Sequence, residues 1–228
     1  MTIQLYDLCG ASKDLRFSPA CWRTRMALEH KGLNYETVPT MFTDIPSIAG
    51  GGQRTVPVIE DGEQIVRESY DIAVYLERTY PDKPSLFDGE GGLQLSRFMH
   101  WWTGATVDAG IVKLVLADIH SILDQADQSY FRESREKRFG KALEEVQNQS
   151  DETLQAFRAS LLPLRLALKK HDFLGGDAPI YADYCVFGSF QWARMVSDLT
   201  LLEGDDPVAQ WFERCLDLFD GLGRKAKG

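Results

Sequence analysis

Residues 55–69 read TVPVIEDGEQIVRES. Two short runs rich in Val and Ile flank the dipeptide Asp61-Gly62, which is typical of the tight turn of a β-hairpin. The segment that follows, SYDIAVYLERTYP at 69–81, places apolar side chains on one helical face before Pro81 ends the pattern. The stretch therefore predicts two antiparallel strands that lead directly into a helix.

The residues before this hairpin predict a strand, a helix and a second strand. TIQLYDL (2–8) alternates as a strand does, SPACWRTRMALEHKG (18–32) reads as a helix closed by Gly32, and NYETVP (34–39) is a short strand followed by a loop with room for a short helix. A parallel pair joined by a crossover helix, followed by a hairpin, builds a four-stranded mixed sheet with helices packed against it. We therefore predict a thioredoxin-like domain over residues 1–81.

Strand patterns nearly vanish in the second part of the chain. The segment PDKPSLFDGE contains two prolines and a glycine, which is typical of a linker, and we place the linker at 82–90. The remainder, 91–228, predicts an all-α domain, so the fold class is α+β. Its helical patterns cover 93–123, 130–149, 152–171, 181–197 and 206–222.

Composition excludes several classes of function. A net charge of −9 disfavours binding to nucleic acid or to an anionic membrane, because both require a positively charged face. No apolar run approaches the roughly 20 residues of a membrane span, and the first residues resemble no signal peptide, so we expect a cytoplasmic protein. The histidines and cysteines follow no metal-ligand spacing, and we expect neither a metal site nor a disulfide framework.

Ser18 stands at the predicted start of the first helix. Ser followed by Pro is a strong helix-start pair, because the hydroxyl accepts from an amide of the first turn and proline gives up a donor that had no partner. The same position suits an anion such as a thiolate. Lowering a thiol pKa by two units requires about 2.7 kcal/mol. A helix end supplies roughly 0.3–1 kcal/mol and a hydrogen bond to a charged group roughly 1.5–3 kcal/mol, so together they suffice. The sequence therefore leaves two roles open for Ser18, namely capping of the helix and stabilisation of a thiolate.

Several motifs, in this order and spacing, resemble the cytosolic glutathione S-transferase superfamily over essentially the whole chain. They are SPACW (18–22), TVPVI (55–59), ES (68–69) and FLGGDAPIYADYCVFG (173–188). SPACWRTRMALEHKG, together with YFRESRE (130–136) and YADY, is similar to the serine-type bacterial beta-etherase-like branch and its fungal relatives.

The resemblance implies a homodimeric transferase that uses glutathione as co-substrate. Ser18 is then the catalytic residue that activates the glutathione thiol for attack on a small apolar electrophile, which we expect to be aromatic. The branch resemblance suggests displacement of a phenol from an aryl ether. Two other functions remain open: a non-catalytic protein that binds glutathione and hydrophobic ligands, and a thiol-disulfide exchanger that uses Cys21.

The resemblance also implies the residues that bind glutathione. Pro57 is expected to follow a cis peptide bond that turns the Val56 backbone toward the cysteinyl part of glutathione. Glu68 and Ser69 are expected to hold the γ-glutamyl end, and Arg54 to meet the glycyl carboxylate. A solvated glutamate beside a capping serine, and a surface arginine in a loop, are the ordinary alternatives.

An aromatic cluster, Phe98, Trp101 and Trp102, opens the long helix of the second domain. Core packing is its ordinary role, whereas the resemblance places this helix beside the acceptor pocket. The chain departs from the family pattern at Ile180, where a Ser or Thr usually forms a capping box with the residue that is Asp183 here. A second departure is an insertion near 122–149, expected to wall the acceptor site or to extend the dimer surface.

Overall fold

The N-terminal part of the chain forms a mixed four-stranded sheet in the order β2-β1-β3-β4. The computed structural model describes residues 2–226. Strand β1 is parallel to β2 and antiparallel to β3, and β3 is antiparallel to β4. Gly62 has a φ of 62° in the turn between β3 and β4, which favours glycine. In chain order the elements are β1 (Ile3–Leu8), α1 (Pro19–His30), β2 (Tyr35–Thr40), η1 (Phe42–Ser47), β3 (Val58–Asp61), β4 (Gln64–Arg67) and α2 (Ser69–Thr79).

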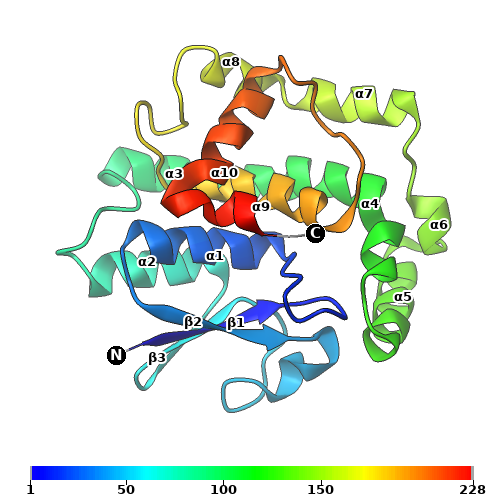
Figure 1. Ribbon diagram of the computed structural model, residues 1–228, viewed down its shortest axis with the longest axis horizontal. Coiled ribbons are helices and arrows are strands. Elements are labelled where there is room, and N and C mark those ends of the chain that lie inside the picture. The colour runs from blue at the N-terminus through cyan, green and yellow to red at the C-terminus, as the bar shows by residue number, and fades with distance from the viewer. Residues whose placement is uncertain (1, 227–228) are drawn as a thin grey trace.

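Helices α1 and α2 lie between the sheet and the helical remainder of the chain (Figure 1). The thioredoxin-like arrangement, the parallel first pair and the hairpin predicted from the sequence are thus confirmed. The 3-10 helix η1 occupies the loop after β2, where the sequence left room for a short helix.

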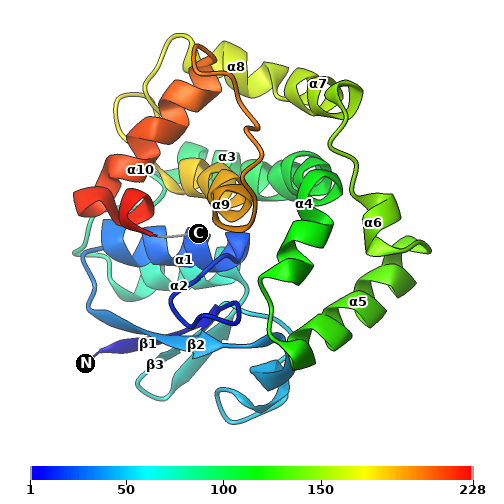
Figure 2. The same ribbon diagram turned by 45° about the vertical axis from the view of Figure 1, so that its right-hand side comes forward.

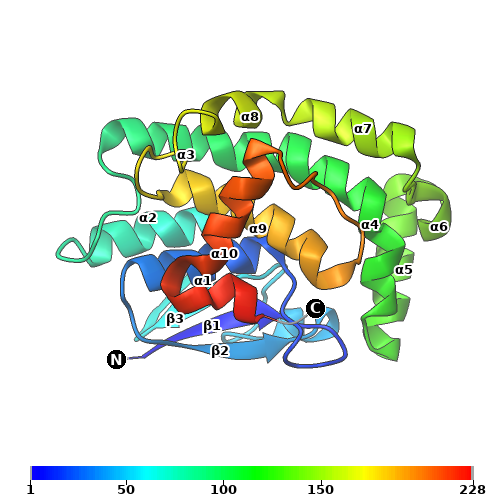
Figure 3. The same cartoon turned by 45° about the horizontal axis from the view of Figure 1, so that its top comes forward.

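The rest of the chain is helical, as predicted. Helix α3 (Glu90–Trp102), the π-helical segment η2 (Thr103–Asp108) and α4 (Ala109–Ser121) run on as one long helix (Figure 3). Helix α10 contains a non-helical break at 218–221. The remaining helices are α5 (Gln125–Phe139), α6 (Leu143–Val146), α7 (Asp151–Ser160), α8 (Leu162–Leu168), α9 (Tyr181–Val196) and α10 (Pro207–Lys225).

The charged helix expected at 130–149 differs from the prediction. Asp124 caps α5 by accepting from the Asp127 N–H at 2.8 Å, so the helix begins earlier. It ends at Gly140, whose φ of 68° is left-handed. The first turn of α5 lies against η1, and the helix runs from there back toward α6 (Figure 2). The insertion therefore reaches the N-terminal part of the chain.

Helix α9 forms the centre of the helical part and packs closely against α1. Nearly all of its residues are buried. Gly188 permits the close approach, because a Cβ at this position would lie 2.4 Å from the carbonyl oxygen of Pro19. The first turn of α1, and Ser18 with it, is therefore held against the most buried helix of the protein.

Candidate functional site

Ser18 is the N-cap of α1. Its Oγ accepts a hydrogen bond from the Cys21 N–H at 3.3 Å, and Pro19 occupies the first helical position. The predicted cap is thus confirmed. Because the cap uses a lone pair of the oxygen, the hydroxyl hydrogen is left to donate to another group. Ser18 is only 6% exposed, but its side chain borders a cavity.

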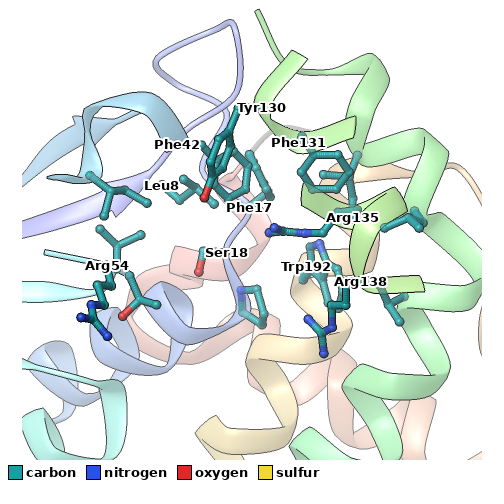
Figure 4. A pocket seen from close by; sticks show the side chains of 17 residues that line it. Leu8, Phe17, Ser18, Phe42, Arg54, Tyr130, Phe131, Arg135, Arg138 and Trp192 are labelled. Carbon is teal, nitrogen blue, oxygen red and sulfur yellow. The ribbon is translucent and has the colours of Figure 1, made fainter. Parts of the chain in front are cut away.

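The cavity has a volume of about 340 Å³ and lies between the start of α1 and the helices α4 and α5 (Figure 4). Most of its lining is apolar or aromatic. Phe42 comes from η1, Tyr130 and Phe131 come from α5, and Trp192 comes from α9. A cavity of this size with an apolar wall and a few polar groups is typical of a small-molecule site.

Two of the residues predicted to bind glutathione, Arg54 and Val56, line this cavity together with Ser18. The peptide bond between Val56 and Pro57 is cis, as the resemblance implied. Within residues 2–226 the N–H and C=O of Val56 form no hydrogen bond with another part of the protein. The backbone at Val56 is therefore free to pair with an extended peptide ligand.

Glu68 and Ser69 lie beside the cavity rather than in its wall. Thr55, which lines the cavity, donates from Oγ1 to Oε1 of Glu68 at 2.9 Å. Glu68 has a φ of 61°, which is unusual for a residue other than glycine. Backbone strain of this kind clusters at ligand sites. Ser69 is buried and is the first residue of α2.

The aromatic cluster of α3 does not line the cavity, which corrects its placement in the acceptor pocket. Phe98 and Trp101 are 62% and 69% exposed, and Trp102 packs against the core. The reason is the rotation of α3, whose opposite face, with Ser96 and Met99, is buried toward α9.

Helix α5, part of the insertion near 122–149, supplies an aromatic wall of the cavity. The sequence predicts that this insertion walls the acceptor site or extends the dimer surface, but it names neither Tyr130 nor Phe131 for that role. Asp127 in its first turn accepts hydrogen bonds from the N–H groups of Phe42 and Thr43 at 2.7 and 2.9 Å. These bonds fix α5 against η1 and bring Tyr130 and Phe131 to the cavity. The segment YFRESRE (130–136) contains both aromatic residues, but its pattern does not indicate which face of the helix borders the cavity.

The cysteines offer no accessible thiolate. Cys21 is fully buried, and burial raises its pKa well above the usual range. Burial also raises the pKa of Cys9. A nucleophilic cysteine needs access and a lowered pKa. The structure therefore disfavours thiol exchange by Cys21.

Among residues 2–226, His, Cys, Asp and Glu side chains form no group of three that would suit a metal ion. No helix in the same range has both the length and the apolar character to cross a membrane.

Comparison with protein families decides the identity of the fold. Residues 14–84 match the model of the glutathione S-transferase N-terminal domain, and residues 95–218 match that of the C-terminal domain. The chain belongs to the glutathione S-transferase family.

Fungal proteins are among the similar members of the family. A glutathione S-transferase-like protein, ustS, of Aspergillus flavus is 26% identical over 82% of this chain and 77% of its own length. The crystal structure of a glutathione S-transferase of Ceriporiopsis subvermispora in complex with glutathione has a TM-score of 0.78 and 26% identity, covering 99% of this chain and 95% of that one. Glutathione transferase GSTFuA3 of Phanerochaete chrysosporium has a TM-score of 0.76 and 29% identity, covering 99% of this chain and 94% of its own.

Proposed function

We propose that this glutathione S-transferase family member is a serine-type enzyme in which Ser18 stabilises the glutathione thiolate. The observation that carries the proposal is the position of its hydroxyl, which caps α1 with a lone pair and borders the cavity. The helix end and the hydroxyl together supply the free energy that a thiolate needs at neutral pH.

The neighbouring residues support a bound glutathione in this orientation. The free backbone groups of Val56, next to the cis bond at Pro57, pair with the cysteinyl part. Glu68 accepts from the γ-glutamyl ammonium, while the amides at Ser69 receive the carboxylate of that end. Arg54 receives the glycyl carboxylate.

The acceptor is an apolar electrophile, and the aromatic wall of α5 favours an aromatic one. The thiolate attacks carbon, a C–S bond forms, and the leaving group departs with the electron pair of the broken bond. The similarity to the beta-etherase-like branch favours an aryl ether, whose C–O bond breaks to release a phenolate that then takes up a proton.

Ser18→Ala and Ser18→Gly test the role of the hydroxyl. Both remove the donor, but glycine at an N-cap costs only a few tenths of a kcal/mol relative to serine. We expect both variants to lose about 10- to 150-fold in conjugation of a generic aromatic electrophile, while retaining glutathione binding. The bound thiol should also ionise at a higher pH, as followed by ultraviolet absorbance. Ser18→Thr keeps a hydroxyl and should restore most of the rate.

Three results would each contradict part of the proposal. An unchanged rate in Ser18→Ala and Ser18→Gly removes Ser18 from the mechanism. Binding of glutathione by the wild type without turnover of any electrophile favours a carrier of hydrophobic ligands. If Cys21→Ser loses activity and Ser18→Ala keeps it, the result favours thiol exchange by Cys21.

We also propose that the protein acts as a cytoplasmic homodimer. The four cysteines are free and buried, which suits a reducing compartment. Leu95, Phe98 and Trp101 form an exposed apolar surface on α3, here called the α3 patch. Exposed apolar patches of this kind mark protein contacts, and we assign the α3 patch to a second copy of the chain.

A further inference from the structure

The cavity beside Ser18 carries more positive charge than the proposed glutathione site uses. Arg54, Arg135 and Arg138 line it, and within the part of the chain that the structure describes its wall contains no Asp or Glu. The whole chain has a net charge of −9. The cavity is therefore a local positive site in an acidic protein, and such a site attracts anions.

Arg135 reaches into the cavity from α5, on the side opposite Arg54 (Figure 4). Its guanidinium carbon lies 4.8 Å from the ring centre of Phe131 and 5.5 Å from that of Phe42. Cation–π contacts of this kind hold a guanidinium in place without neutralising it. The Arg135 side chain is thus oriented, but among residues 2–226 no acidic side chain that lines the cavity balances its charge.

The arginines of α5 differ in whether an acidic side chain pairs with them. Arg132, on the same helix, lies 2.8 Å from Glu136 and 2.7 Å from Glu144. Within residues 2–226 no carboxylate lies within the 4.0 Å of an ion pair from Arg135 or Arg138. The helix therefore pairs its arginine outside the cavity and leaves those inside it unpaired.

An unpaired cation that is partly removed from water raises the free energy of the empty site. Burial lowers the pKa of Arg135, and the nearby charge of Arg138 acts in the same direction. An anion placed between the two guanidinium groups would relieve this cost, and a carboxylate matches guanidinium geometry with two parallel hydrogen bonds. Arg54 is taken by the glycyl carboxylate, so Arg135 and Arg138 remain for the second substrate.

We propose that the acceptor is an aromatic molecule that carries a carboxylate, which Arg135 binds together with Arg138. The ring of the acceptor then lies against the aromatic wall formed by Phe42, Tyr130 and Phe131, and its electrophilic carbon faces Ser18. This inference rests on the proposed function, because it names the substrate class of the same site.

A matched pair of electrophiles tests the proposal. In 4-chloro-3-nitrobenzoate the thiolate attacks the carbon that bears chlorine, a C–S bond forms and chloride leaves; the methyl ester of the same acid is the neutral partner. We expect Arg135→Met to lower the ratio of kcat/KM for the acid to that for the ester by about 10-fold or more. Arg138→Met should lower the same ratio. Arg135→Lys keeps the charge but not the paired hydrogen bonds, so it should lower the ratio less than Arg135→Met does.

Arg132→Met is the control, because Arg132 lies on the same helix outside the cavity, and the ratio should stay at the wild-type value. Melting curves check that each variant folds. If Arg135→Met does not fold, the ratio measured for Arg138→Met tests the proposal instead. An unchanged ratio in the folded variant overturns the inference. A weakened affinity for glutathione with an unchanged ratio also overturns it, because Arg135 would then serve the co-substrate.

Binding without turnover separates this inference from the proposed function. Calorimetry with unreactive analogues, in which a methyl group replaces the chlorine, gives the dissociation constants of acid and ester for each variant. If the wild type conjugates neither substrate but binds the acid through Arg135, the proposed function fails and the inference stands. If conjugation proceeds and Arg135→Met binds the acid as tightly as the wild type, the inference fails and the proposed function stands.

Discussion

Arg23 of α1 donates from Nη2 to Oδ2 of Asp108 at 2.8 Å and joins the thioredoxin-like part of the protein to the long helix of the second part. Its Nε donates to the carbonyl oxygen of Cys185 in α9 at 3.0 Å. The guanidinium is nearly inaccessible, since only 6% of the side chain is exposed. The contact therefore holds α1, which carries Ser18, in a fixed position against the helical wall of the cavity.

Asp108→Ala is expected to destabilise the protein by about 3–5 kcal/mol, because it leaves the charge of Arg23 buried and unpaired. The free energy of unfolding in urea measures this loss. Glu203→Ala is the matched control: it breaks the Arg158 pair at 2.7 Å, but Glu203 is 63% exposed, so the cost should be about 1 kcal/mol or less. Equal losses in the two variants would refute a special role for the buried pair.

Asp183 is the buried acceptor that holds the start of α9. Its carboxylate accepts from the N–H groups of Leu174 and Ile180 at 2.8 and 3.0 Å and from Nε1 of Trp211 at 2.9 Å. Ile180 stands where the family pattern has a Ser or Thr, and the reciprocal side-chain bond is impossible here because the isoleucine side chain has no acceptor.

Asp183→Ala leaves several buried donors without a partner and should cost about 3 kcal/mol or more in the free energy of unfolding. The control is Ser150→Ala, which removes the exposed cap of α7, where Oγ accepts from the Thr153 N–H at 3.3 Å. A loss of about 1 kcal/mol is expected there. A loss at Asp183 no larger than that at Ser150 would show that the donors find other partners.

Local signals explain what the sequence could and could not predict. The turn at Gly62 and the cap at Ser18 depend on neighbouring residues, and both are found as expected. The cavity wall depends on the rotation of α3 and on the contact of Asp127 with η1, which join segments distant in the chain. Amphipathic patterns identify a buried face, but they do not say which cavity the other face borders.

His30 makes stability depend on pH. Its Nδ1 lies 2.6 Å from the hydroxyl of Tyr184, and burial lowers its pKa, an effect that the charge of Lys31 reinforces and that of Glu77 opposes. Between the ordinary histidine pKa and the lowered one, the unfolded chain binds more protons than the folded protein. Stability therefore rises with pH in this window and is lost as the pH falls below about 6.5.

His30→Asn is expected to flatten the dependence of the unfolding free energy on pH between about pH 7.5 and 5.5. Part of the slope should remain, because burial also lowers the pKa of His100 and His120. A slope in His30→Asn as steep as in the wild type would exclude His30 as its source.

The α3 patch predicts an oligomer that a single charge disrupts. Trp101 is 69% exposed. A glutamate at this position would have to lose its hydration when a second copy covers the patch. Trp101→Glu should therefore shift the protein from dimer to monomer, as measured by sedimentation. Leu166→Glu is the control, because Leu166 is 55% exposed on a different helix, α8, and it should leave the dimer intact. Because the melting temperature of a dimer depends on concentration, only the Trp101 variant should lose that dependence. The prediction is contradicted if the wild type sediments as a monomer. It is also contradicted if Leu166→Glu breaks the dimer and Trp101→Glu leaves it intact, because the exposed aromatic residues of α3 would then have another role.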